Sequence, residues 1–204
     1  MPLTPSKIVC IGRNYREHAR EMGNDVPTEP LFFLKAPSSI IAGGEAIVLP
    51  SGSTHVEFEG EIALVLGARL RKATESEARA AVTHVVALND VTARDWQKGD
   101  GQWTRAKGMD TFCPIGDPVP APDDLESITL VTRVNGVECQ RATGADMVFA
   151  IPMVLAYISQ YLTLEPGDII ATGTPAGTKA LNAGDVVEVE LVGLSSVSNP
   201  VVAA

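Results

Sequence analysis

The chain has 204 residues, of which 45% are hydrophobic and 20% are charged, and its formal net charge is −9 at pH 7. This length and composition predict a single domain, residues 1–204, with its own hydrophobic core. The acidic balance, with no run of Lys or Arg, argues against a nucleic-acid-binding protein and against attraction to anionic membranes.

The cysteines and the apolar segments indicate a cytoplasmic protein. Cys10, Cys113 and Cys139 are odd in number and far apart, which is typical of reduced thiols rather than a disulfide framework. The N-terminus has no apolar stretch that would predict a signal peptide. The longest apolar segment, residues 147–162, is too short for a membrane span and contains Pro152, so a buried helix is expected.

The first elements are a strand over residues 7–11 and a short helix that Asn14 can cap and Gly23 can end. His18 and Glu21 are three residues apart and therefore share one face of this helix. A carboxylate beside an imidazole fixes its tautomer and raises its basicity, as a general base requires. A surface helix with ordinary charge pairs explains the same spacing.

A polar loop, residues 23–30, leads to a second strand over residues 31–35 that ends on Lys35. This lysine either faces a substrate or simply forms the polar end of the strand. A turn and a further strand over residues 45–49 follow.

The segment 57–67 predicts an acidic strand. Glu57, Glu59 and Glu61 occupy every second position before an apolar run that ends at Gly67. Alternate side chains of a strand share a face, so the three carboxylates point the same way. Either they bind a hard cation through oxygen ligands, or they are solvated at the end of the strand.

The next segments predict a helix over residues 75–82, opened by a Thr74–Glu77 capping box, and a buried strand over residues 84–90. Asp90, at the end of that strand, is a second candidate metal ligand or a turn-forming residue. Residues 98–102 are expected to form a mobile loop. Arg94 and Asp95 are expected to pair with each other or with neighbours.

The C-terminal half predicts a hairpin, because Asn135-Gly136 separates two strand-like runs over residues 128–134 and 137–141. The apolar helix comes next, with Asp146 as a possible N-cap, followed by strands over residues 169–172 and 186–192. Strands outnumber helices and do not alternate strictly with them. The pattern therefore predicts an α+β protein with a mixed, curved sheet rather than a doubly wound fold.

Six segments in order resemble the fumarylacetoacetate hydrolase family: Gly12-Arg13-Asn14-Tyr15, His18-x-x-Glu21, residues 58–63, 89–95 and 105–112, and Thr172-Gly173-Thr174-Pro175. The similarity covers nearly the whole chain. It is to the short, single-domain branch, which includes acylpyruvate hydrolases, oxaloacetate decarboxylases and isomerases of homoprotocatechuate breakdown. The resemblance implies the fold of the family's C-terminal domain, with mixed curved β-sheets arranged as a roll or sandwich and few helices.

The resemblance also implies roles for particular residues. Glu59, Glu61 and Asp90 would bind Mg²⁺ or Mn²⁺, which leaves Glu57 next to the ligands or solvated. The implied catalytic groups are His18, Glu21 and Lys107, with Lys107 stabilising enolate charge and the His–Glu pair lying on a lid, residues 12–30. The implied substrate-binding residues are Arg13, Tyr15, Lys35, Gln97 and Thr174.

The implied function is that of a divalent-metal-dependent enzyme acting on small 2-oxo acids through a metal-bound enolate. The expected reactions are C–C bond hydrolysis of acylpyruvates such as acetylpyruvate or fumarylpyruvate, decarboxylation of oxaloacetate, and isomerisation of 2-hydroxyhepta-2,4-diene-1,7-dioate. A homodimer or higher even oligomer is expected. The alternatives are a catalytically silent metal-binding protein and a structural domain with a solvated acidic strand.

Overall fold

The computed structural model describes residues 4–204. Its helices are α1 (Arg16–Glu21), α2 (Glu75–Ala81), α3 (Arg94–Gly99), α4 (Thr104–Lys107) and α5 (Ile151–Tyr161), with short 3₁₀ turns at Pro37–Ser39 and Gly144–Asp146. Its strands are β1 (Ile8–Gly12), β2 (Leu31–Lys35), β3 (Ile40–Ile41), β4 (Ile47–Leu49), β5 (Val56–Glu57), β6 (Gly60–Leu66), β7 (Val82–Asn89), β8 (Thr92–Ala93), β9 (Cys113–Pro114), β10 (Val119–Pro120), β11 (Thr129–Val134), β12 (Val137–Thr143), β13 (Ile169–Ala171), β14 (Val186–Leu191) and β15 (Ser195–Ala203).

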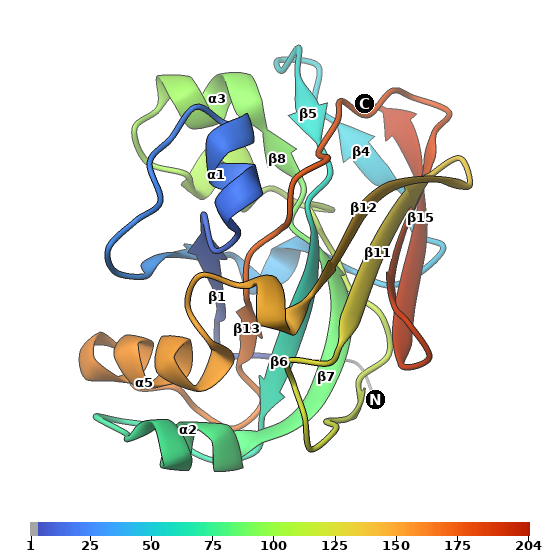
Figure 1. Cartoon of the computed structure of the whole chain (residues 1–204). Coiled ribbons are helices and arrows are strands. Elements are labelled where there is room, and N and C mark those ends of the chain that lie inside the picture. Colours follow the sequence, from blue (N-terminus) through green and yellow to red (C-terminus); the bar gives the residue numbers. More distant parts are fainter. Residues whose placement is uncertain (1–3) are drawn as a thin grey trace.

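Two larger sheets organise the fold (Figure 1). One has the strand order β10-β7-β6-β13-β1-β2, and the other has the order β12-β11-β14-β15-β4. Most neighbouring strands are antiparallel, but β1 runs parallel to β13 and β4 runs parallel to β15. The sheets are therefore mixed, which confirms the predicted α+β class.

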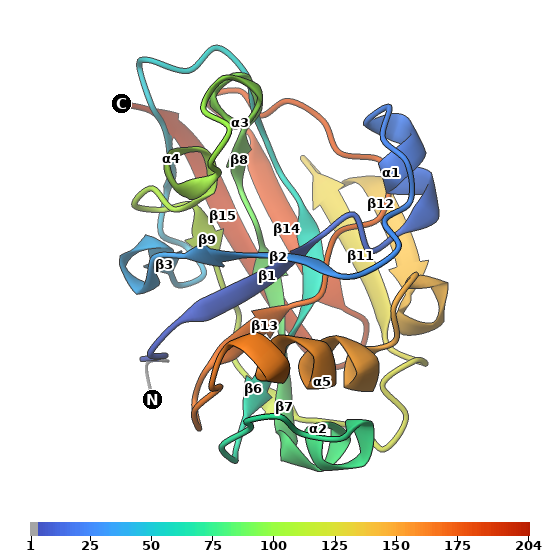
Figure 2. The ribbon, with the colours of Figure 1, turned by 90° about the vertical axis from the view of Figure 1, so that its left-hand side faces the viewer.

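The two long central strands, β6 and β7, lie where the sheets meet. Every residue of β6 is buried, and so are the last five residues of β7. The main hydrophobic cluster joins their side chains to those of β11, β14, α2 and α5. Figure 2 shows α2 and α5 at one end of the molecule, while α1, α3 and α4 lie toward the other end. Within the described residues, no helix is both long and apolar enough to cross a bilayer.

Two local predictions are confirmed in detail. The hairpin of β11 and β12 turns through Asn135 and Gly136, whose φ angles of 52° and 77° both lie in the left-handed region of a type I′ turn. Thr74 and Glu77 form the expected capping box at the start of α2.

Three predictions about strands and loops need correction. The acidic segment is not one strand, because Glu57 ends β5, which pairs with β8, before β6 begins at Gly60. Lys98 and Gly99 belong to α3 rather than to a mobile loop. The chain also has a further strand, β15, after the predicted strand over residues 186–192.

Two other predicted helix N-caps, Asn14 and Asp146, are wrong. Asn14 does not cap α1. It accepts a hydrogen bond from the N–H of Phe149 and donates to the carbonyl of Thr172, so it joins separate segments of the chain. Helix α5 begins later than expected, after Ala150, and Asp146 instead accepts hydrogen bonds from the backbone and side chain of Thr143.

Candidate active site and metal centre

Pairing of β6 with β7 brings together acidic residues that are far apart in the sequence. In the antiparallel register Gly60 lies opposite Asn89, and the N–H of Asp90 donates to the carbonyl of Glu59 over 2.8 Å. One carboxylate oxygen from each of Glu59, Glu61 and Asp90 lies within 4.8 Å of the others. All three side chains are buried.

This carboxylate cluster could hold a metal ion. Three buried carboxylates form an all-oxygen donor set, which suits a hard divalent cation. Glu61 makes no ion pair within the described residues, and Oε2 accepts only the N–H of Gly173, over 2.8 Å. Gly173 has a φ of 100°, and an added Cβ would lie 2.8 Å from that of Asn14, so this close backbone approach requires glycine. An ion would give Glu61 the positive partner that it lacks.

Three buried cations surround the carboxylate cluster. Lys107 Nζ donates to Glu59 Oε2 over 2.8 Å and to Asp90 Oδ2 over 2.7 Å. Lys35 Nζ lies 2.5 Å from Asp90 Oδ1 and also donates to the backbone carbonyl of Lys107. Arg94 contacts Glu59 Oε1 over 2.6 Å and Glu57 Oε2 over 2.7 Å. Glu57 is therefore neither solvated nor a member of the cluster, because it anchors this arginine.

These charges shift the pKa values of Glu59 and Glu61 in opposite directions. Burial alone would raise the pKa of Glu59, but the positive charges of Lys107 and Arg94 outweigh it and hold this pKa well below its usual range. Burial, together with the negative charges of Asp90 and Glu59, raises the pKa of Glu61 well above its usual value. Burial alone would lower the pKa of Lys107, but Asp90 and Glu59 raise it, so the lysine stays charged.

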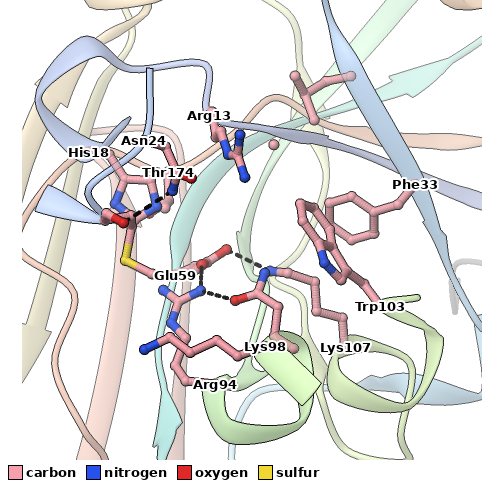
Figure 3. Close-up of a pocket in the computed structure, with 14 residues that line it drawn as sticks. Arg13, His18, Asn24, Phe33, Glu59, Arg94, Lys98, Trp103, Lys107 and Thr174 are labelled. Carbon is pink, nitrogen blue, oxygen red and sulfur yellow. Dashed lines mark hydrogen bonds and ion pairs between the residues drawn. The ribbon is translucent and has the colours of Figure 1, made fainter. Parts of the chain in front are cut away.

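A pocket of about 260 Å³ opens beside the carboxylate cluster (Figure 3). Its walls come from the end of β1, the α1 segment, β2, α3, α4 and the loop after β13. It is lined by Ile11, Gly12, Arg13, His18, Met22, Asn24, Phe33, Glu59, Arg94, Gln97, Lys98, Trp103, Lys107 and Thr174.

The imidazole–carboxylate pair lies at this pocket. Helix α1 places His18 Nδ1 3.2 Å from Glu21 Oε2, and only 5% of His18 is exposed. Glu21 also accepts the N–H of Gly177, so α1 is tied to the loop that carries Thr174. Because Nδ1 faces Glu21, the other ring nitrogen, Nε2, is the one left for proton exchange in the pocket.

The structure brings most of the predicted site residues together. Glu59, His18, Lys107, Arg13, Gln97 and Thr174 line the pocket, and Glu61 and Asp90 complete the carboxylate cluster. Lys35 is buried against Asp90 and does not line the pocket. Tyr15 lines a different cavity, where its hydroxyl donates to the carbonyl of Thr143 over 3.4 Å. The substrate-binding roles of these residues stay predictions.

Sequence reasoning missed two parts of the site. Arg94 is only 3% exposed and links Glu57, Glu59 and Gln97, although the sequence suggested nothing beyond a local charge pair. The sequence signal for its burial was its position after the apolar residues Val91 and Ala93. The second part is an aromatic wall in which the rings of Phe33 and Trp103 meet edge to face, with centroids 5.1 Å apart.

The fold and the site define a class of protein. It is an α+β protein whose buried carboxylate cluster, able to hold a cation, adjoins a pocket with an imidazole–carboxylate pair and a buried lysine. A family model described as fumarylacetoacetate (FAA) hydrolase C-terminal matches residues 7–202. The chain belongs to the fumarylacetoacetate hydrolase family, in its short branch.

Similar proteins in this family include several enzymes. The chain is 40% identical, over 192 residues, to a mitochondrial oxaloacetate tautomerase from Caenorhabditis elegans, covering 90% of this chain and 88% of that protein. It is 41% identical, over 194 residues, to a 2,4-didehydro-3-deoxy-L-rhamnonate hydrolase from Sphingomonas, covering 89% and 68%. The crystal structure of 2-hydroxyhepta-2,4-diene-1,7-dioate isomerase from Mycobacterium marinum superposes with a TM-score of 0.90 at 40% identity, covering 99% and 76%.

Proposed function

We propose that this protein is a divalent-metal-dependent hydrolase that cleaves a C–C bond of acylpyruvates, and that the same site decarboxylates oxaloacetate. The observation that carries the proposal is the His18–Glu21 pair, with 3.2 Å between Nδ1 and Oε2, at the wall of a pocket that Glu59 and Lys107 also line. A base and a site for negative charge in one pocket suit cleavage that leaves an enolate.

The proposed metal ligands are Glu59, Glu61 and Asp90. Their oxygens fit Mg²⁺ or Mn²⁺, which prefer oxygen ligands. When bound, the ion would supply positive charge that favours the enolate form of a 2-oxo acid.

The hydrolytic steps follow from the positions of this chain's own residues. Glu21 holds the imidazole of His18 in one tautomer, and Nε2 takes a proton from water. The resulting hydroxide attacks the distal carbonyl of the acylpyruvate, and the bond between that carbon and the pyruvate methylene breaks. Its electron pair forms the enolate of pyruvate, which the imidazolium of His18 protonates at carbon. One water is consumed, and the products are a carboxylic acid and pyruvate.

Lys107 is the proposed stabiliser of the enolate. Lys107 is 2% exposed, and three hydrogen bonds, one of them to Thr92 over 2.7 Å, fix its ammonium group. Its positive charge therefore acts on the enolate without reorganisation when negative charge develops. Arg13 and Thr174 are the proposed contacts for the substrate carboxylate. Residues 12–30, which carry His18 and Glu21, are proposed to act as a lid over the pocket.

Reactions that need no attacking water are the second candidates. Decarboxylation of oxaloacetate yields the same enolate, and tautomerisation or isomerisation requires only proton transfer at carbon. The similarity to an enzyme named as an oxaloacetate tautomerase favours testing these reactions on the same site.

The test follows the loss of acetylpyruvate enol absorbance in the presence of Mg²⁺ and then of excess chelator. We expect chelator-sensitive loss with acetate and pyruvate formed in equal amounts. His18→Gln should lower kcat by about 10²- to 10⁴-fold, because general-base catalysis is worth that much. His84→Gln is the matched control, because His84 lies on β7 away from the pocket.

The reactions can be separated with the same variants. Oxaloacetate decarboxylation should survive His18→Gln better than hydrolysis does, because it uses no activated water. Equal loss of both activities would count against this division of roles. Wild-type inactivity on acetylpyruvate and oxaloacetate would refute the proposed function and leave isomerisation to be tested; inactivity on a broad panel of oxo acids would favour a silent metal-binding protein.

A further inference from the structure

Two cations at the pocket have no partner in the network described above. Arg94 and Lys107 are held by carboxylates, whereas Arg13 and Lys98 form no ion pair with any carboxylate of residues 4–204. The chain as a whole carries a net charge of −9, so two unpaired cations at one pocket are opposite in sign to the protein's overall charge. A bound anion can supply the negative partner that these two cations lack.

The two cations stand on different walls. Arg13 follows β1 and has a φ of 60°, a left-handed conformation that is uncommon for a residue with a side chain. Lys98 comes from α3. Figure 3 shows the two side chains on opposite sides of the pocket, with Glu59 between them in that view. A single ligand that pairs with both cations would carry a negative charge at each of its ends.

Helix α3 explains why Lys98 reaches this position. Arg94, Gln97 and Lys98 occupy positions i, i+3 and i+4, which share one face of a helix, and all three line the pocket. Arg94 is buried and donates to Gln97 Oε1 over 3.0 Å. Lys98, one residue further along, is exposed. The face therefore runs from the buried carboxylate cluster toward the mouth of the pocket and ends in a free ammonium group.

One wall of the pocket is apolar. Ile11 and the aromatic wall of Phe33 and Trp103 line it. Gly12 leaves room for this wall, because a Cβ added there would lie 3.2 Å from the indole of Trp103. The pocket thus offers an apolar surface to a carbon chain and two unpaired cations to negatively charged groups of a ligand.

We propose that Lys98 is a specificity-determining residue that favours 2-oxo acids with a second carboxylate at the far end of the acyl chain. The inference rests on the proposed function for the reacting end, where Arg13 and Thr174 receive the oxo-acid carboxylate. Lys98 acts on the tail, at the mouth of the pocket, and takes no part in bond cleavage.

The test compares two substrates that differ only at the tail. Butanoylpyruvate and succinylpyruvate carry four-carbon acyl groups, and only the second ends in a carboxylate. We expect the ratio of kcat/KM for succinylpyruvate to that for butanoylpyruvate to fall about three- to tenfold in Lys98→Gln, mainly through KM, and further in Lys98→Glu. That range corresponds to one partly exposed ion pair. Added NaCl should lower the wild-type ratio toward that of the variant.

Lys72→Gln is the matched control. It removes the same charge from the α2 end of the molecule, opposite α3 (Figure 1), and should leave the ratio unchanged. An unchanged ratio in both Lys98 variants would overturn the proposal. So would an equal fall in Lys72→Gln, because it would show general attraction to the protein rather than recognition by Lys98.

A binding measurement separates this proposal from the proposed function. If the wild type cleaves neither acid, hydrolysis is refuted, and the Kd of each acid in the presence of Mg²⁺, measured by calorimetry, decides the role of Lys98. Tighter wild-type binding of succinylpyruvate that is lost in Lys98→Gln would support it. Equal Kd values for the two acids would overturn it.

Discussion

Replacement of Lys107 by methionine tests the buried charge network most directly. Lys107 is 2% exposed, and its ammonium group donates to Glu59, Asp90 and Thr92 over 2.7–2.8 Å. Methionine has a similar length and leaves little cavity, so the main change is the loss of charge. Removing one partner of a buried ion pair costs roughly 3–5 kcal/mol, because the remaining charge is uncompensated.

The surviving contacts set the expected magnitude at the lower end of that range. Lys35 still pairs with Asp90, and Arg94 still pairs with Glu59, so neither carboxylate is left alone. We expect Lys107→Met to lower the free energy of unfolding by about 3 kcal/mol in the presence of chelator. For a chain of this size that loss corresponds to a fall in Tm of about 6–12 °C.

Urea denaturation with chelator and with saturating Mg²⁺ measures the effect. A bound ion gives the carboxylates a new positive partner, so the deficit should shrink when Mg²⁺ is present. Lys98→Met is the control, because it makes the same substitution at an exposed position and should change stability by less than about 0.5 kcal/mol. A loss below about 1 kcal/mol in chelator, or a deficit that Mg²⁺ does not reduce, would refute the reasoning.

Two further predictions follow from the same region. The raised pKa of Glu61 means that an incoming ion displaces a proton, so Mg²⁺ affinity should rise with pH and binding should release protons. Calorimetry in buffers of different ionisation enthalpy measures that release, and Glu61→Gln should abolish it; pH-independent affinity in the wild type would contradict the assignment. Gly60→Ala would place a Cβ 1.9 Å from Thr132 Oγ1, so it should destabilise the fold by at least about 2 kcal/mol. Adding Thr132→Ala should recover part of that loss, because Oγ1 makes no hydrogen bond, and a double variant as unstable as Gly60→Ala would point to another cause.

Much of the fold was predictable where local chemistry decides the structure. Two to four neighbouring residues are enough to determine the Asn135-Gly136 turn and the Thr74–Glu77 cap. Strand β15 was missed because its inward positions include polar residues. Ser195 and Asn199 are buried there, with Ser195 donating to the carbonyl of Asp117 and Asn199 donating to that of Ala42. Such partners come from distant segments, so no local pattern reveals them.

The same distinction applies to the site. The spacing of the acidic segment indicated either a cation site or a solvated strand end, and only the pairing of Gly60 with Asn89 shows how Asp90 joins the cluster. Resemblance to the family supplied the candidate residues, but not the role of Glu57 as an anchor for Arg94. Alternation would place Glu57 on the same face as Glu59, whereas the chain leaves the strand between them.

The built-in counterions also bear on how the protein matures. A zinc finger cannot fold without its ion, because nothing else holds its ligands together. Here Lys35, Arg94 and Lys107 already pair with Glu59 and Asp90, so the chain can complete its fold before any ion arrives. An ion bound at the carboxylate cluster would then be an exchangeable part of a finished protein, and the supply of divalent ions around the newly made chain would decide which one it receives.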